Sequence, residues 1–243
     1  AIHMKEYKYI FGPIPSRRMG NSLGISPIEK RSCSYSCVYC QLGRTKNLLK
    51  EPQKFFNIND ILDEFKDYLK EDVKIDVVTV VGEGEPTLCA DLEELIVNLK
   101  KITDKPIAVI TNGSMLIYKS VREALKKADI VLPSLDAGDE VTFRRINRPN
   151  GKISFEKITE ALIEFSKEYK GQLWMETMIV KDFNDTPKQF YAIKKILDEM
   201  NYDRLYINTP VRPPAEDYVC EPDDDVLEEE VKVLGGTSIQ QLT

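Results

Sequence analysis

The sequence contains one histidine, His3, which stands in a short lead, residues 1–4, that we interpret as a cloning remnant ahead of the native Met4. On that interpretation the native chain contains no histidine. The absence excludes a histidine-based catalytic triad, a zinc enzyme with imidazole ligands and a histidine general base.

Long hydrophobic runs and an excess of basic charge are also missing. No apolar run approaches the roughly 20 residues that a membrane-spanning helix needs, and the N-terminus lacks the pattern of a secretion signal. We therefore expect a cytoplasmic protein with no membrane partner. Because 34 Lys and Arg face 40 Asp and Glu, the net charge is −6. A domain that binds nucleic-acid backbone is usually basic overall, so composition does not support broad nucleic-acid binding.

Most of the chain alternates between short apolar runs and segments with apolar residues at helical spacing. Six buried strands are predicted, each nearly all apolar as parallel strands covered on both faces are, at 23–26, 75–81, 107–111, 129–135, 173–180 and 205–208. Helices are predicted around 58–69, 92–99, 118–127, 155–165 and 187–197, with Asp91 and Ser154 as caps. Six β-then-α units predict an α/β fold with a partial (β/α)6 parallel barrel of the TIM type. An open doubly wound sheet is the alternative that periodicity leaves open.

Three segments are expected along the chain. Residues 1–8 form the tag remnant and lead, 9–215 the core, and 216–243 an acidic C-terminal extension. The extension contains a predicted helix from about Asp223 to Leu234, ended by Gly235. We expect it to be an appended cap.

Three of the five cysteines, Cys33, Cys37 and Cys40, fall within eight positions. An odd number of cysteines in a cytoplasmic protein favours metal or redox chemistry over disulfides. Three thiolates can hold a four-iron cluster and leave one iron open for chemistry. A structural zinc site, which needs a fourth ligand, remains an alternative. A Cys37–Cys40 redox dithiol and cysteines without a function are two others.

The spacing Cys33-x3-Cys37-x-Tyr39-Cys40 resembles the signature of the radical S-adenosylmethionine (radical SAM) superfamily. The similarity continues through blocks of the branch related to the wyosine-forming tRNA enzymes, whose members are often labelled iron–sulfur oxidoreductases. These blocks are FGPIPSRRMGNSLGISP (11–27), VGEGEPTL (81–88), ITNGSML (110–116), LPSLDAGDEVTFRRINRP (132–149) and MIVKDFND (178–185).

This resemblance implies a [4Fe-4S] cluster on Cys33, Cys37 and Cys40, with S-adenosylmethionine on the open iron. It also implies a reducing partner such as ferredoxin or flavodoxin. The glycine-rich segment after the second strand would meet the methionine amino group, and Tyr39 would lie near the adenine. Cofactor contacts are expected at Tyr39, Gly82, Glu83, Gly84, Glu85, Thr111, Asn112, Ser134 and Asp136.

The substrate side is predicted from charge and position. Arginine favours planar anionic groups, so some of the arginines in these blocks are hypothesised to bind an anionic substrate or the carboxylate of the cofactor. Glu176 lies inside an apolar strand and is expected to face the barrel interior. Candidate substrate residues are Arg17, Arg18, Arg145, Arg148, Glu176, Asn208 and Arg212.

One departure from the family narrows the function. No cysteine precedes Cys33, so the second cluster of the wyosine-forming enzymes has no ligands here, and one cluster is expected. We predict an enzyme that cleaves S-adenosylmethionine to a 5′-deoxyadenosyl radical and removes hydrogen from an unidentified substrate, either nucleotide or RNA-like or a partner protein. An iron–sulfur electron carrier and a zinc-bound interaction module are the alternatives. Cys89 is expected to be a buried bystander, with a role as hydrogen donor or methyl carrier left open.

Overall fold

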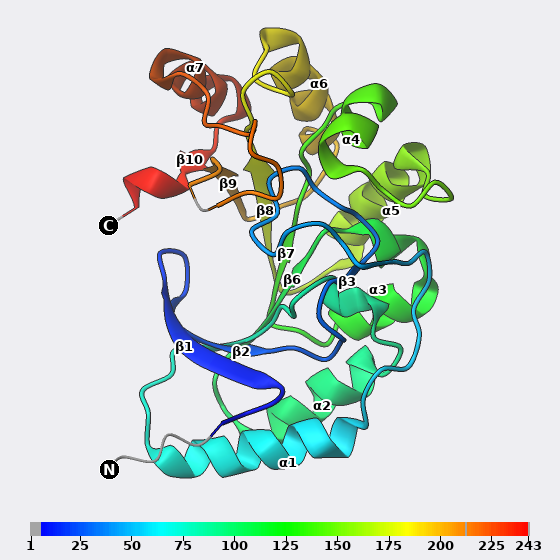
Figure 1. Cartoon of the computed structure of the whole chain (residues 1–243), viewed down its shortest axis with the longest axis vertical. Helices are drawn as coiled ribbons and strands as arrows, with labels where there is room; N and C mark the ends of the chain where they lie inside the picture. The colour runs from blue at the N-terminus through cyan, green and yellow to red at the C-terminus, as the bar shows by residue number, and fades with distance from the viewer. Residues whose placement is uncertain (1–5, 212, 243) are drawn as a thin grey trace.

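The computed structural model describes residues 6–211 and 213–242, so part of the expected lead and the candidate Arg212 lie outside the described residues. Its main feature is an eight-stranded sheet in the order β1-β2-β5-β6-β7-β8-β9-β10 (Figure 1). Only β1 and β2 pair antiparallel, and the other neighbours are parallel. The strands are β1 (Ile10–Ser16), β2 (Gly20–Ile25), β5 (Val77–Val80), β6 (Ile107–Thr111), β7 (Ile130–Pro133), β8 (Gln172–Met178), β9 (Arg204–Asn208) and β10 (Thr237–Ser238).

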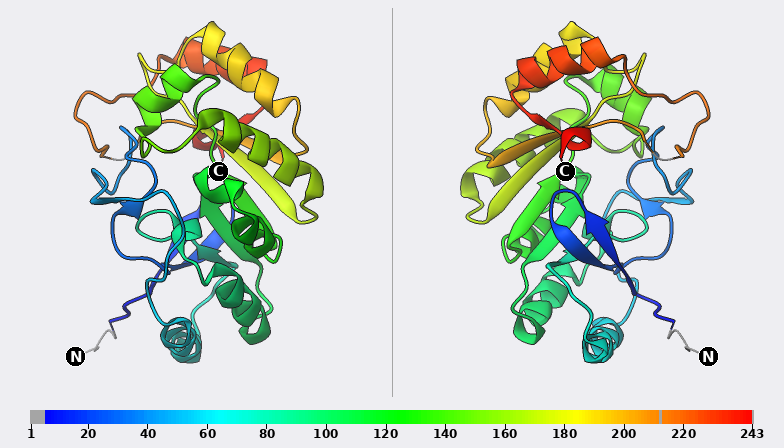
Figure 2. Two further views of the ribbon diagram at one scale, coloured as in Figure 1. Left: turned by 90° about the vertical axis from the view of Figure 1, so that its right-hand side faces the viewer. Right: turned by 90° about the vertical axis from the view of Figure 1, so that its left-hand side faces the viewer.

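The sheet is a partial barrel and not a doubly wound sheet. From β2 to β9 the parallel strands follow one another in chain order without a reversal, so right-handed crossovers place their helices on one face. Figures 1 and 2 show the helices outside the curved sheet, which stays open between its edge strands β1 and β10. The α-helices are α1 (Ile58–Tyr68), α2 (Leu92–Ile102), α3 (Lys119–Leu125), α4 (Glu140–Asn147), α5 (Phe155–Glu168), α6 (Pro187–Leu197) and α7 (Asp224–Leu234).

Short 3-10 turns complete the fold at η1 (Leu69–Glu71), η2 (Pro86–Leu88), η3 (Ser114–Ile117) and η4 (Ile239–Gln241). Within the described residues, no helix combines the length and apolar character needed to cross a membrane.

The six predicted parallel strands are confirmed, but the edges of the sheet and one helix were missed. Strand β1 contains Gly12, Pro13 and Pro15, residues that argue against a strand unless it lies at an edge, as this one does. Strand β10 has two residues and joins the sheet only by pairing with β9, so the expected C-terminal extension supplies an edge strand of the sheet. Helix α4 has only three apolar residues, Val141, Phe143 and Ile146, so its periodic signal is weak.

The predicted helix caps differ in outcome. The Ser154 side chain accepts a hydrogen bond from the backbone N of Lys157 at 3.3 Å, as a cap does. Asp91 stands at the cap position of α2, but its side chain makes no capping hydrogen bond. Gly235 ends α7 in the left-handed conformation, with φ of 73°, as predicted.

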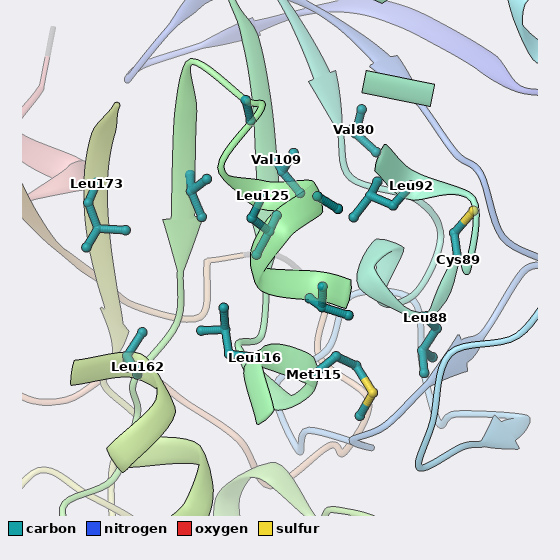
Figure 3. Close-up of a cluster of buried hydrophobic side chains, with 14 of the residues drawn as sticks. Val80, Leu88, Cys89, Leu92, Val109, Met115, Leu116, Leu125, Leu162 and Leu173 are labelled. Carbon is teal, nitrogen blue, oxygen red and sulfur yellow. The ribbon is translucent and has the colours of Figure 1, made fainter. Parts of the chain in front are cut away.

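The main hydrophobic core lies between the outer face of the sheet and the helices. Alternate residues of the strands, such as Val80 and Val109, pack there against Leu92 and Leu125 from the helices (Figure 3). Cys89 belongs to the same cluster and is 3% exposed. Burial raises the pKa of its thiol to about 11, so it is a protonated packing residue at neutral pH.

The inner face of the barrel changes from apolar to polar along the strands. A second, smaller cluster fills the inside at the level of Ala108, Leu132 and Trp174, with Ile239 of η4 closing it from the C-terminal segment. Two residues beyond Trp174 on the same face of β8 comes Glu176. A cavity above this apolar floor is therefore lined by polar groups at the carboxyl ends of the strands.

Glu230 on α7 is a buried carboxyl group with no hydrogen-bond or ion-pair partner among the described residues. Its side chain is completely buried, and neither oxygen has a hydrogen-bond partner among the described residues. Burial, together with repulsion from Asp185, raises its pKa to about 9. The folded state therefore keeps this group protonated at neutral pH, whereas the unfolded chain ionises it near its ordinary value.

We expect Glu230→Gln to stabilise the protein increasingly as pH rises. Because the folded-state pKa of Glu230 is raised, its favourable contribution is complete below about pH 4.5 and is lost as the pH approaches about 9. The neutral amide removes this loss, so the melting temperature of the variant should exceed that of the wild type at pH 8 and match it near pH 4. Thermal melts across this range check it, with the exposed neighbour variant Glu229→Gln as control. Equal gains at both pH values would contradict the assignment.

Candidate active site

The cysteine loop lies between β2 and α1 and is closed at its base. Strand β3 (Ser32–Cys33) pairs with β4 (Asn47–Leu48), and Leu49 N donates to Cys33 O at 2.8 Å. Inside the loop, Cys40 N donates to Cys37 O at 3.1 Å. All three cysteines are free and partly exposed. They therefore lie on one short loop, closed by backbone hydrogen bonds, at the carboxyl end of the first parallel strand.

Burial makes the three thiols weak acids in the absence of a metal. It raises the pKa of Cys33 to about 12, raises that of Cys37 well above its ordinary value and raises that of Cys40. Neighbouring negative charge adds to the effect, from Glu85 on Cys33 and from Asp136 on Cys37. A bound cation would therefore be needed to stabilise the ionised form of these thiols, and metal binding would release their protons.

Two asparagine amides point at the sulfur atoms. Asn112 Nδ2 lies 3.6 Å from Cys33 Sγ, and Asn147 Nδ2 lies 3.3 Å from Cys37 Sγ. The backbone N of Tyr35 also donates to Cys33 Sγ at 3.4 Å. Donors of this kind stabilise negative charge on thiolates and are among the groups that set the potential of iron–sulfur clusters.

Asn147 was not predicted as a site residue. The one indication of Asn147 in the sequence is its position within the block 132–149. Nothing in that block predicts that the end of α4 contacts the cysteine loop. The structure brings them together because Ser36 N donates to Asn147 O at 3.0 Å and Val38 N donates to Ile146 O at 3.0 Å.

The glycine-rich loop after β5 lies directly against the cysteine loop. Arg31 N donates to Glu83 O at 2.6 Å, and Glu85 N donates to Ser32 O at 3.0 Å. A Cβ atom on Gly84 would stand 2.0 Å from Ser32 O, so only glycine permits this approach. The Glu83 carbonyl expected to meet the cofactor is therefore occupied by the cysteine loop.

Glu85 holds these loops together instead of facing the cavity. Its carboxylate is 2% exposed and accepts hydrogen bonds from Thr111 Oγ1 at 2.7 Å, Asn112 N at 2.7 Å and Thr87 N at 3.0 Å. The Thr87 hydroxyl also donates to it. Burial nevertheless raises the pKa of Glu85, because desolvation outweighs these donors. Thr111 and Asn112, which were expected to contact the cofactor, thus make their hydrogen bonds to Glu85 and to the cysteine loop.

The C-terminal side of the molecule clamps the cysteine loop through Glu216. Arg44 donates to both carboxylate oxygens, at 2.8 and 3.0 Å, and Arg148 Nη1 donates at 2.8 Å. These arginines, Arg44 first, lower the pKa of Glu216 to about 2. Glu216 N also donates to Val38 O at 3.2 Å. The ion pair thus fixes the path of residues near 216 over the loop.

A cavity of about 650 Å³ opens beside Cys40 at the carboxyl ends of the strands. The β1–β2 hairpin, the cysteine loop, the glycine-rich loop, the end of β8 and the segments that follow β7 and β9 form its walls. Ten of the residues singled out from the sequence line it: Arg17, Arg18, Tyr39, Cys40, Gly82, Gly84, Ser134, Asp136, Glu176 and Asn208. Eight others do not line it: Cys33, Cys37, Glu83, Glu85, Thr111, Asn112, Arg145 and Arg148.

The two arginines outside the cavity have other partners. Arg148 Nε donates to Ser36 O at 2.5 Å in addition to its bond with Glu216. The Arg145 guanidinium lies 5.1 Å from the ring centre of Phe183. Neither position supports the expectation that these side chains bind substrate, and Arg148 serves to position the cysteine loop.

Asp136 connects the cavity wall to the cysteines. The Tyr39 hydroxyl donates to its carboxylate, as do Asn147 Nδ2 at 3.0 Å and Met178 N at 2.9 Å. Burial raises its pKa, so the donors are needed to hold the ionised form. Because Asn147 also reaches Cys37, the carboxylate orients the amide that bonds the sulfur.

A continuous chain of polar side chains lines the cavity, beginning at Glu176, which pairs with Ser134 on the neighbouring strand segment. Arg18 Nη1 donates to Glu176 Oε2 at 3.0 Å, and Asn208 Nδ2 donates to Glu176 Oε1 at 3.1 Å. Gln240 Nε2 then donates to Asn208 Oδ1 at 2.9 Å, and Arg17 Nη1 donates to Ile239 O at 3.3 Å. The β1–β2 hairpin and the C-terminal segment therefore meet across the open side of the barrel.

The donor set fits a [4Fe-4S] cluster better than a single ion. Among the residues that the structure describes, no three Cys, His, Asp or Glu side chains converge tightly enough for one ion, as a zinc site requires. In a four-iron cube each cysteine binds a different iron, so the sulfurs stand further apart. Amide donors at Cys33 and Cys37, together with a cavity beside Cys40, suit such a cluster.

Comparison with known proteins gives a consistent picture. A family model described as the radical SAM superfamily matches residues 30–193. A protein of Brachyspira hyodysenteriae named GTPase Obg is 41% identical over 225 residues, which are 93% of this chain and 33% of that protein. A UPF0026 protein of Methanocaldococcus jannaschii is 41% identical over 219 residues, covering 89% of this chain and 68% of that protein. The chain thus spans about a third of the first relative and two thirds of the second.

Solved structures share the fold at low identity. TYW1 with a lysine-pyruvate adduct bound has a TM-score of 0.64 at 20% identity, covering 89% of this chain and 74% of that one. Streptococcus suis SuiB bound to S-adenosylmethionine has a TM-score of 0.63 at 18% identity, covering 87% of this chain and 46% of that one. At these identities the likeness concerns the fold alone.

We expect Gly84→Ala to disrupt cluster loading while the barrel stays folded. The added methyl group would collide with Ser32 O and push the cysteine loop away from the glycine-rich loop. Iron content after anaerobic reconstitution should fall from about four atoms per chain to about one or fewer. Gly151→Ala is the matched control, because nothing lies within 4 Å of its added Cβ. Iron analysis with circular dichroism checks this, and full loading of Gly84→Ala would refute it.

Asn147→Leu is expected to make the reduction potential of a bound cluster more negative. The leucine is similar in size but offers no N–H to Cys37 Sγ, so the more negative reduced state loses a stabilising donor. A potentiometric titration followed by electron paramagnetic resonance measures the change. Asn98→Leu, on the exposed side of α2, is the control and should leave the potential unaltered.

Proposed function

The chain belongs to the radical SAM superfamily, and from this premise we propose that it binds a [4Fe-4S] cluster through Cys33, Cys37 and Cys40 and reductively cleaves S-adenosylmethionine. When bound, the cluster supplies the one electron that breaks the sulfur–C5′ bond, giving methionine and a 5′-deoxyadenosyl radical that takes a hydrogen atom from the substrate. The observation that carries the proposal is the closed three-cysteine loop at the mouth of the cavity.

The wall nearest Cys40 offers the groups that would hold S-adenosylmethionine. Tyr39 presents a ring, Ser134 a hydroxyl, and Gly82 and Gly84 bare backbone that a ligand can approach. The cavity volume of about 650 Å³ lies within the usual range for small-molecule sites. Glu85, Thr111 and Asn112 do not line the cavity. They act indirectly, by positioning the loops that do.

The part of the cavity wall formed by the Arg18–Glu176–Asn208 chain is assigned to the substrate. Its side chains are held by one another before any ligand arrives. Arg18 is compensated by Glu176, whereas no carboxylate of the described residues is paired with Arg17. An anionic group of a nucleotide-like substrate would therefore meet Arg17 first, and one residue of a partner protein is the competing substrate.

Each residue on this wall has a separable task. Arg18 and Glu176 hold the substrate through complementary charges, and Asn208 fixes the orientation of the Glu176 carboxylate. The apolar floor beneath them, which includes Trp174 and Leu132, excludes water from the bottom of the barrel. Exclusion of water matters because a carbon radical must meet only the intended C–H bond.

We expect anaerobically reconstituted protein to form 5′-deoxyadenosine and methionine from S-adenosylmethionine after reduction with dithionite. Cys33→Ala, Cys37→Ala and Cys40→Ala should each lower the yield at least about a hundredfold, because a cluster with two protein ligands is not held in place. Cys89→Ala and Cys220→Ala are matched controls that should retain it, since one packs in the core and the other is an exposed thiol outside the cavity. Mass spectrometry of the products is the measurement.

Two outcomes would contradict the proposal. A fully loaded cluster that gives no 5′-deoxyadenosine and no change of its reduced spectrum with S-adenosylmethionine would indicate an electron carrier. Zinc in place of iron in the reconstituted protein would indicate an interaction module.

A further inference from the structure

The cysteine loop carries a charge opposite to that of the whole chain. The chain has a net charge of −6, yet residues 30–50 contain five Lys and Arg and no Asp or Glu. The five side chains are Lys30, Arg31, Arg44, Lys46 and Lys50, here named the basic face. Such an asymmetry in an acidic protein concentrates positive potential on one loop.

All five residues of the basic face are exposed. Lys30 Nζ is 3.9 Å from Glu83, a long contact between exposed side chains, and Arg44 is bound to Glu216. Arg31, Lys46 and Lys50 form no ion pair with a described carboxylate. Glu29 and Glu51 flank the segment in sequence and are the nearest acidic residues along the chain. The positive charge is therefore only partly compensated.

The basic face lies on the cysteine loop but outside the cavity. None of its five residues lines the cavity, so they do not serve the substrate pocket. Arg44 and Lys46 lie within the loop 33–48 that carries the three partly exposed cysteines, and Lys30, Arg31 and Lys50 flank it. Leu48 is 41% exposed among them, and Leu42, which also lines the cavity, is 39% exposed. Asn150 Nδ2 donates to Leu48 O at 3.0 Å, which adds the exposed Lys152 nearby.

We infer that the basic face is the docking surface for an acidic one-electron carrier protein that reduces the cluster. This inference rests on the proposed function, because that reaction consumes one electron per cleavage. A carrier on this face approaches the cluster through the thickness of a single loop and leaves the cavity free for substrate. Small charged surfaces around a few apolar side chains suit weak electron-transfer complexes, where opposite charge accelerates encounter.

A nucleic acid is the other polyanion that this face could attract. The described structure favours the carrier, because the basic face lacks aromatic side chains on which bases could stack: Tyr35 is buried and Tyr39 faces the cavity. The net negative charge of the chain also opposes a long polyanion more than a small acidic protein.

The test compares two electron sources on a charge-reversed variant, Lys30→Glu/Lys46→Glu/Lys50→Glu. The matched control is Lys66→Glu/Lys70→Glu/Lys101→Glu, which changes the net charge equally at exposed positions of α1, η1 and α2. Reduced flavodoxin serves as the acidic carrier, and photoreduced 5-deazaflavin serves as a small reductant that needs no docking surface. The rate of cluster reduction is followed by bleaching of the oxidised cluster, at several salt concentrations.

We expect the variant to be reduced by flavodoxin at least about tenfold more slowly than wild type at low salt, and at an equal rate by 5-deazaflavin. The control should behave as wild type with both, and salt should slow the wild type more than the variant. Equal flavodoxin rates for the variant and wild type would overturn the inference. So would loss of binding to a tRNA probe with an unchanged flavodoxin rate, which would assign the face to RNA. If no protein forms 5′-deoxyadenosine even with 5-deazaflavin, the proposed function fails instead.

Discussion

The contact between the glycine-rich loop and the cysteine loop is the constraint on which the rest of the site depends. Gly84 approaches Ser32 so closely that no side chain fits, and backbone hydrogen bonds tie the loops on both sides of this point. Glu85 extends the contact to Thr111 and Asn112 at the end of the next strand. Through its backbone N, which donates to Ser32 O, and its buried carboxylate, Glu85 thereby links three successive loops, so the placement of the cysteines follows from the register of the barrel strands.

The inner face of the barrel changes in polarity along the strands. Its inner face is sealed by an apolar layer around Trp174 and becomes polar at Glu176, one pleat further along the same strand. This change of polarity follows from the alternation of side chains in β-strands. It places the charged groups where loops converge and keeps the floor dry. The open side of the barrel is bridged by the hydrogen bond from Arg17 to Ile239 O.

The sequence carried enough information to predict the parallel strands and the role of the cysteines. It carried too little to predict which distant residues contact the cysteine loop. Apolar runs predict parallel strands because both faces are covered, and three closely spaced cysteines have few other uses. Strand β10 escaped prediction since two residues without apolar character carry no periodic signal. Asn147 and Glu216 escaped for another reason: their importance arises from contacts with a loop more than a hundred residues earlier, which no local pattern records. Thr111 and Asn112 were found by position, but their orientation toward Glu85 required the structure.

The Glu216 clamp has a consequence for how the protein matures in the cell. Arg44 and Val38 acquire their partner only when residue 216 has been synthesised, and by then strands β1 to β9 have all left the ribosome's catalytic centre. Until then the cysteine loop lacks its Glu216 restraint, so the clamp is among the last contacts of the site that the growing chain can make.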